Sequence, residues 1–365
     1  MNKNIILFDL SSNKTKIKNL KKYIINENVQ NFLEIIYLFL KMILLLIILI
    51  FYFLIKDKEP EKIPTKNDFA FIVCLFAQPK LRSDHRIFKY FHSLNDYVPQ
   101  SKVIFIVSKF TIIDHNLLQF KNLNITIERY GRETVRYLLR KYKYRGVLHD
   151  FFVYIRPFIY IDYLYKHPEI KYVCVCDDDT LFFRDPFFLL IQNHTNEVHI
   201  MEDIFPFTRT VDLNYIWTNQ WVKLNNSIKQ KCDFKILNKT LLSDDIKNRI
   251  PLNSGLMIGK STNLIKIFEL LVSKYECTHT FPFYSDQGLL NYLDLSGELK
   301  ELNISIRRHN IYNDSLISCP EYMPMPDFIR QINSPHFIAI HHFNGLRHTH
   351  FSKSAFLSHI FNITR

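Results

Sequence analysis

The sequence predicts an α/β fold with a mainly parallel central sheet, preceded by one transmembrane helix. Continuous apolar runs, such as FAFIVCLF at 69–76 and KYVCVC at 171–176, are typical of strands buried on both faces of a parallel sheet. Segments with a helical pattern separate these runs, as a parallel sheet requires. A single apolar stretch at 35–55 is long enough to cross a membrane.

The stretch IIYLFLKMILLLIILIFYFLI predicts a membrane anchor. Its 21 residues rise about 32 Å as a helix, which covers the hydrocarbon core. Its one charge, Lys41, lies near the N-terminal end and can snorkel to the interface. A signal peptide is a poor alternative, because a polar tail precedes the run and no small-residue cleavage site follows it. The expected organisation is a tail at 1–34, the anchor at 35–55, a charged stem at 56–67 and one domain at 68–365.

The charges around the anchor favour a cytoplasmic tail and a lumenal domain. Six lysines precede the span, whereas the four lysines that follow it closely are offset by four acids. All six cysteines come after the span, as do seven of the eight N-x-[ST] sequons, which suits an oxidising lumen but defines no disulfide pairing. We therefore expect a single-pass type II protein of the Golgi or ER membrane with its domain in the lumen.

The composition argues against a disordered chain and against a nucleic-acid-binding protein. With 47% apolar and 22% charged residues, the chain is globular rather than disordered. The formal net charge is +12, but the basic residues form no clustered stripe, which argues against nucleic-acid binding. The 7 glycines form no phosphate-cradling loop, so a phosphate-bearing substrate would need a metal ion or side-chain cations.

The individual elements follow from the apolar pattern. We expect strands at 69–76, 101–108, 124–130, 171–176, 197–205 and 254–260. We expect helices around 87–94, 147–166 and 262–275. Ser261 or Thr262 is available to cap the last of these helices. In parallel sheets, ligands gather beyond the carboxyl ends of the strands.

Three consecutive aspartates, Asp177, Asp178 and Asp179, follow the strand at 171–176. Their mutual repulsion predicts a cationic partner. Asp177 and Asp179 form a D-x-D pattern whose two carboxylates can approach one ion, and hard oxygen ligands suit Mn²⁺ or Mg²⁺. A solvated turn is about equally probable for a lone D-x-D, but the apolar flanks here make unpaired charge expensive.

Three further stretches place polar side chains beside apolar segments: 251–260 with Asn253, Ser254 and Gly255; 284–293 with Ser285, Asp286 and Gln287; and 337–348 with His341, His342, Gly345, Arg347 and His348. Each stretch has a structural alternative when taken alone, namely a plain turn, an N-cap and a structural histidine. Four of the 7 glycines fall inside these stretches, as close approach of a backbone to a ligand would need.

The order D-x-D, N-S-G, D-Q-x-x-L-N and H-F-x-G resembles the metal-dependent glycosyltransferases of the GT-A type, especially the glycogenin and galactinol-synthase-like family. The resemblance covers about residues 69–350. It implies a single GT-A domain, a Rossmann-like nucleotide-diphospho-sugar transferase. The implied donor is a nucleotide sugar, usually a UDP-sugar, used with Mn²⁺. The resemblance also implies transfer with retention of anomeric configuration. The expected lumenal location, rather than the resemblance, suggests a glycan, glycoprotein or lipid acceptor.

The resemblance also implies the site residues. The implied metal ligands are Asp177, Asp179 and His342. The implied catalytic residues, which line the sugar pocket, are Asn253, Asp286 and Gln287. The implied substrate-binding residues are Asp178, Arg156, Ser254, Gly255, Gly345, Arg347 and His348.

The chain departs from the family at two places. Gly288 stands where the family often has Asp, and His348 stands where a Lys-Pro-Trp follows H-F-x-G, so Arg347 or His348 would take over the diphosphate contact.

Two other functions fit parts of the pattern. An anchored homologue could bind sugar without transferring it. A metal-dependent phosphoester hydrolase would also use clustered aspartates, but it would need more acidic ligands on neighbouring strand ends, and the sequence shows one such cluster.

Overall fold

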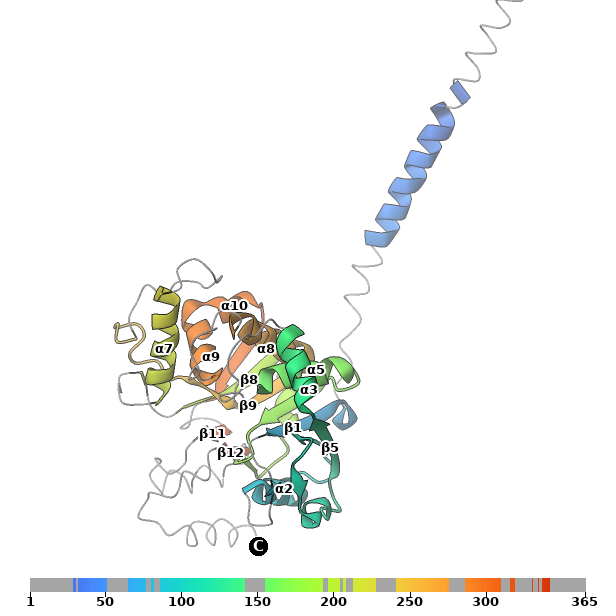
Figure 1. Ribbon diagram of the computed structural model, residues 1–365. Coiled ribbons are helices and arrows are strands. Elements are labelled where there is room, and N and C mark those ends of the chain that lie inside the picture. Colours follow the sequence, from blue (N-terminus) through green and yellow to red (C-terminus); the bar gives the residue numbers. More distant parts are fainter. Residues whose placement is uncertain are drawn as a thin grey trace, which may run out of the picture. The chain divides into compact units, whose positions relative to one another are not determined.

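The computed structural model describes residues 29–30, 32–50, 65–76, 80–81, 86–141, 155–192, 196–203, 206–207, 213–227, 241–275, 286–309, 316–318, 330, 334 and 337–341 (Figure 1). The chain divides into two units, Met1–Ile63 and Pro64–Arg365.

The first unit contains an apolar helix. Its stretch Phe32–Ile50 has 19 residues with a mean hydropathy of 2.8, so by length and composition it could cross a membrane. The large apolar side chains along it are exposed, unlike those of a core helix. This helix covers 35–50 of the predicted anchor, and 51–55 lie outside the described residues.

The second unit is built on a seven-stranded sheet with the order β10-β8-β9-β6-β1-β3-β5. Its strands are β1 Phe69–Leu75, β3 Lys102–Ser108, β5 Asn124–Tyr130, β6 Tyr172–Cys176, β8 Glu197–Glu202, β9 Leu252–Lys260 and β10 Ser305–His309. Neighbouring strands pair in parallel except at β9, which is antiparallel to β6 and β8. The predicted α/β fold with a mainly parallel sheet is confirmed.

The predicted strands all correspond to strands of this sheet, although β8 ends at Glu202, before the predicted end at 205. The sequence did not reveal β10. Its residues Ser305–His309 alternate between exposed and partly buried positions until the buried His309. An edge strand needs no continuous apolar run, so the pattern that identifies the central strands is missing there.

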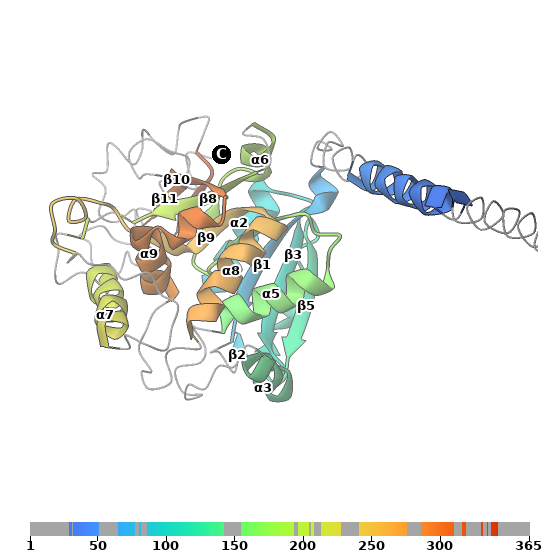
Figure 2. The same cartoon turned by 90° about the horizontal axis from the view of Figure 1, so that it is seen from above.

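Helices cover both faces of the sheet (Figures 1 and 2). Helix α2 lies on one side, and α5 and α8 lie side by side on the other. The helices are α2 Arg86–Tyr97, α3 Arg132–Lys141, α5 Arg156–Lys166, α6 Phe187–Gln192, α7 Leu213–Ser227, α8 Ser261–Tyr275, α9 Asp286–Ser296 and α10 Glu298–Glu301. This arrangement buries alternate side chains of β1 in two separate cores, Ala70 and Ile72 on one side and Phe71 and Val73 on the other.

One helix prediction needs correction and another is only partly tested. Helix α8 begins at Ser261 itself, and the Ser261 hydroxyl donates a 2.6 Å hydrogen bond to the Ile170 carbonyl instead of capping a helix that follows it. Helix α5 begins at Arg156, within the predicted 147–166, and 147–154 lie outside the described residues.

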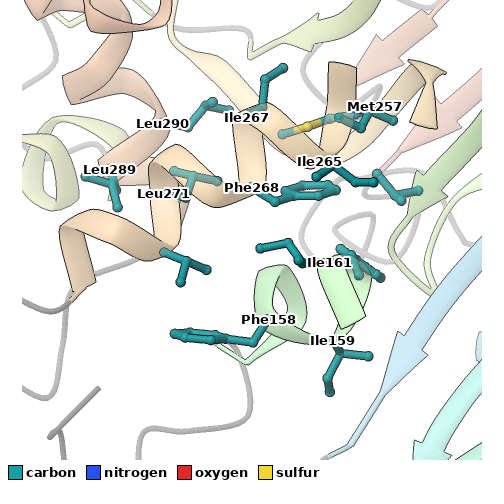
Figure 3. Packing of buried hydrophobic residues seen from close by; sticks show 14 of the residues in the cluster. Phe158, Ile159, Ile161, Met257, Ile265, Ile267, Phe268, Leu271, Leu289 and Leu290 are labelled. Atoms are coloured by element: carbon teal, nitrogen blue, oxygen red, sulfur yellow. The ribbon is translucent and has the colours of Figure 1, made fainter. Parts of the chain in front are cut away.

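The hydrophobic core between the sheet and helices α5, α8 and α9 supports the elements that carry the candidate site. Figure 3 shows its close packing through Phe158, Ile159, Ile161, Met257, Ile265, Ile267, Phe268, Leu271, Leu289 and Leu290. Because such packing leaves little freedom of rotation, the residues at the first turns of α5 and α9 have fixed positions relative to β6 and β9.

Candidate active site

The site lies where the strand order reverses. From β1 the chain moves outward through β3 and β5, and then returns to pair β6 with the other side of β1. In open α/β sheets, ligands bind at the carboxyl ends of the strands at such a switch point. The acidic triplet follows the carboxyl end of β6 directly.

The three aspartates occupy a tight turn tied to the neighbouring strand. The amide of Asp177 donates to the carbonyl of Gly255 at 2.8 Å, and the amide of Thr180 donates to the carbonyl of Asp177 at 3.3 Å. The side chains of Asp178 and Asp179 are only 5% and 9% exposed. Carboxylates at this depth need cationic partners, and two arginines provide them.

Arg156 joins two motifs that are far apart in sequence. Its guanidinium pairs with Asp177, and its Nη2 lies 2.9 Å from Oδ2 of Asp286. Helix α5 starts at this residue because Pro157 favours a first turn, and the apolar residues after it anchor the helix. Burial alone would lower the pKa of Arg156, but Asp177 and Asp286 raise it well above its usual value. Arg156 is therefore a permanent cation in the site.

Arg86 holds the other two aspartates. Its Nε and Nη2 each lie 2.6 Å from one carboxylate oxygen of Asp178, and its Nη1 lies 3.7 Å from Oδ2 of Asp179. Burial would lower the pKa of this guanidinium, but the bond to Asp178 and the nearby aspartates raise it. The sequence analysis did not identify Arg86. Its position in the connection after β1, the first strand at the switch point, was the available signal.

The N-S-G and D-Q stretches meet beside Arg156. The Ser254 hydroxyl donates to Oδ1 of Asp286 at 3.4 Å, and the Ser254 amide donates to Oε1 of Gln287 at 3.3 Å. The Gln287 amide group in turn donates to Asp203, at the end of β8, at 3.0 Å. Asn253 is fully buried and accepts a 2.7 Å hydrogen bond from the Gly255 amide. The structure thus brings these predicted residues together from β9 and α9.

Asn291 locks the two stretches in register. Its side-chain oxygen accepts from the Leu252 amide at 2.7 Å, and its side-chain nitrogen donates to the Leu252 carbonyl at 2.9 Å. This side chain pairs with the backbone of β9 as a neighbouring strand would. It therefore fixes the start of α9 against the N-S-G stretch, a role that the sequence analysis had not assigned to the final Asn of D-Q-x-x-L-N.

A small pocket opens between these groups. Its polar wall is formed by Arg156, Asp177, Ser254 and Asp286, and its apolar wall includes Met257 and Phe268. The pocket has room for about one water molecule, and it marks the point where these polar side chains converge.

The C-terminal site residues are only partly described. His342, Gly345, Arg347 and His348 lie outside the described residues. Strand β12, Ala339–His341, pairs antiparallel with β7, Leu181–Phe182, so that Ile340 lies opposite Leu181. The chain leaves the acidic turn along β7, and the antiparallel β12 therefore runs back toward that turn. His341, the last residue of β12, is the residue of this strand closest in register to the turn.

The carboxylates of the site are hard oxygen donors. Arg86 and Arg156 together contact the four carboxylates of Asp177, Asp178, Asp179 and Asp286. No group of three His, Cys, Asp or Glu side chains that could hold a metal ion occurs among the residues that the structure describes. Carboxylate oxygens of this kind are the ligands that Mn²⁺ and Mg²⁺ prefer.

Gly288 allows α7 to pack against the start of α9. A Cβ at this position would lie 2.8 Å from the carbonyl carbon of Trp217 and 2.9 Å from its oxygen. The contact leaves no room for a side chain after Gln287 unless backbone atoms of α7 move. Gly288→Ala should lower the free energy of unfolding by about 1–3 kcal/mol, because backbone atoms must move.

Chemical denaturation measures the effect of this change. Gly131→Ala is the matched control, since the nearest atom to its added Cβ is the Lys109 side chain at 3.6 Å. Equal unfolding midpoints for the two variants would contradict the packing role of Gly288.

Comparisons with known proteins find likeness in structure alone. No family model matches the chain, and no curated protein matches it either. Mouse xyloside xylosyltransferase 1 in its apo form aligns with 12% identity over 75% of this chain and 97% of its own, at a TM-score of 0.40.

Two further solved structures show the same degree of likeness. Core-mannan synthase A from Aspergillus fumigatus, in its Mn/GDP form, aligns with 13% identity over 69% of this chain and 74% of its own, at a TM-score of 0.37. A glycosyltransferase involved in glycosylation of the major capsid of PBCV-1 aligns with 9% identity over 75% of this chain and 92% of its own, at a TM-score of 0.35. All three TM-scores lie below 0.5, and we therefore infer the function from the chain's own residues.

Proposed function

We propose that the chain is a glycosyltransferase of the GT-A type that moves a sugar from a nucleotide-sugar donor to a glycan, glycoprotein or lipid acceptor. One observation carries this proposal. The D-x-D, N-S-G and D-Q stretches, which the sequence separates widely, meet at the strand-order switch, where Arg156 contacts both Asp177 and Asp286. If the three stretches were only a solvated turn, a turn into a strand and a helix cap, nothing would require their polar side chains to meet at one place.

Different residues of the chain would bind the cation, the phosphates and the sugar of the donor. Asp177 and Asp179, with His342, would hold the cation, which when bound offsets the charge that develops on the departing diphosphate. The support for His342 is the course of β12 toward the acidic turn. Ser254, Gly255 and Gly345 would approach the donor closely, and Arg347 or His348 would contact its phosphates.

Asp286, Gln287 and Asn253 would orient the donor sugar. Asp286 is held in place by Arg156 and Ser254, so its carboxylate is fixed before substrate arrives. Its anionic form beside the sugar would stabilise positive charge at the reacting carbon, and the family resemblance implies retention of configuration. We propose a UDP-sugar as donor on the same resemblance.

We propose that the chain is a single-pass type II protein of the Golgi or ER membrane, with the catalytic domain in the lumen. The apolar helix at Phe32–Ile50 and the lysines before it support this topology. A lumenal domain would meet glycoprotein or lipid acceptors.

A donor screen tests the function. The full chain in detergent is incubated with UDP- and GDP-sugars, with Mn²⁺, with Mg²⁺ or with a chelator, and release of the nucleoside diphosphate is measured. We expect Mn²⁺-dependent release from one class of donor, faster with acceptor than with water alone. Release of inorganic phosphate from phosphoesters without any use of a nucleotide sugar would instead identify a hydrolase. Sugar binding without release would identify an inactive homologue.

A further inference from the structure

We propose that Arg86 couples metal binding to donor binding, so that the acidic turn takes up its cation tightly only together with the nucleoside diphosphate. This inference rests on the proposed function and deepens it. Arg86 would be a positioning residue that makes the cation a companion of the donor rather than a resident ion.

The argument begins with charge at short range. The guanidinium of Arg86 lies 3.7 Å from Oδ2 of Asp179, one of the proposed metal ligands. It also holds both carboxylate oxygens of Asp178 at 2.6 Å. A cation at the acidic turn would therefore meet a positive charge within a few ångströms and a triplet whose middle charge is already neutralised. Both effects weaken metal binding in the free protein.

When the donor is bound, we expect the positive charge of Arg86 to favour binding of the cation instead of opposing it. A diphosphate brings negative charge to the same turn, so the guanidinium that opposed the cation attracts the ligand that comes with it. Metal and diphosphate should then each strengthen the binding of the other by the same factor.

The two arginines differ in their freedom to act in this way. Arg156 is 16% exposed and lies between Asp177 and Asp286. The Arg86 side chain is 44% exposed, and Arg86 is the first residue of α2, the helix that follows β1 along the chain. The more exposed guanidinium, that of Arg86, therefore has more freedom to turn from the carboxylates toward an arriving phosphate.

The test measures binding without turnover. Titration calorimetry with Mn²⁺ alone, with UDP or GDP alone, and with each nucleotide at saturating Mn²⁺ gives the coupling factor. For Arg86→Gln we expect Mn²⁺ alone to bind roughly tenfold more tightly, the nucleoside diphosphate with Mn²⁺ roughly tenfold more weakly, and the coupling factor to fall accordingly. Arg86→Lys, which keeps the charge, should lie between this variant and the original chain.

Opposite shifts in the two affinities distinguish this role from a structural one, which would weaken both. Arg136→Gln is the control, because Arg136 is 47% exposed and pairs with Glu133 on α3. It should retain the original coupling.

The outcomes separate this inference from the proposed function. If the original chain binds Mn²⁺ and nucleotide cooperatively but Arg86→Gln shows the same coupling, the role of Arg86 is refuted and the function stands. If the original chain binds neither nucleotide in the presence of Mn²⁺, both are refuted.

Discussion

Replacing Arg156 by Met should lower the free energy of unfolding by about 3–5 kcal/mol and abolish sugar transfer. The reason is that the change leaves Asp177 and Asp286, whose side chains are 23% and 8% exposed, without their shared cation. Their repulsion would also separate β6 from the start of α9, so the two halves of the site would lose their common geometry. Chemical denaturation and the donor-release assay measure the two effects.

A charge-preserving variant tests the geometry. Arg156→Lys keeps one positive charge but cannot extend two separate nitrogens toward two carboxylates. We expect it to recover much of the stability and little of the transfer. Arg136→Met removes a surface ion pair instead and should cost at most about 1 kcal/mol. An Arg156→Met protein as stable as the Arg136→Met protein would show that the bridge does not hold the site together.

The central strands could be predicted because their residues are apolar on both faces. β1, β3 and β6 lie in the middle of the sheet with helices on either side, and their continuous apolar runs follow directly from that burial. β10 lies at the edge and β7 has two residues, so neither has a run to recognise. The fold class could be predicted because the central strands, which are buried on both faces, have the clearest sequence pattern.

The site was predictable in its motifs but not in its contacts. The acidic turn and the D-Q stretch could be identified because they interrupt apolar segments, and the structure brings them within reach of one side chain, Arg156. Which cations balance the aspartates could not be read from the sequence. Arg86 is 92 residues from Asp178, and its position after the first strand at the switch point is the one feature that distinguishes it from the many other basic residues of this chain.

Replacing Asp179 by Asn should reduce Mn²⁺-dependent transfer by about 10²–10³-fold or more, because the change removes a charged oxygen ligand while keeping the shape of the side chain. The free energy of unfolding should change little or rise, since the turn loses one of three crowded negative charges and Arg86 keeps its two close bonds to Asp178. Loss of transfer with a preserved fold would separate a metal ligand from a structural acid.

Asp244→Asn is the matched control, because Asp244 is 95% exposed and pairs with Lys247 far from these contacts in the sequence. It should retain transfer. Raising the Mn²⁺ concentration should restore part of the activity of Asp179→Asn, because a weakened site still fills at higher metal. If Asp179→Asn transfers sugar at the original rate with a chelator present, the aspartates balance the two arginines and hold no metal, and the diphosphate must rely on guanidinium groups alone.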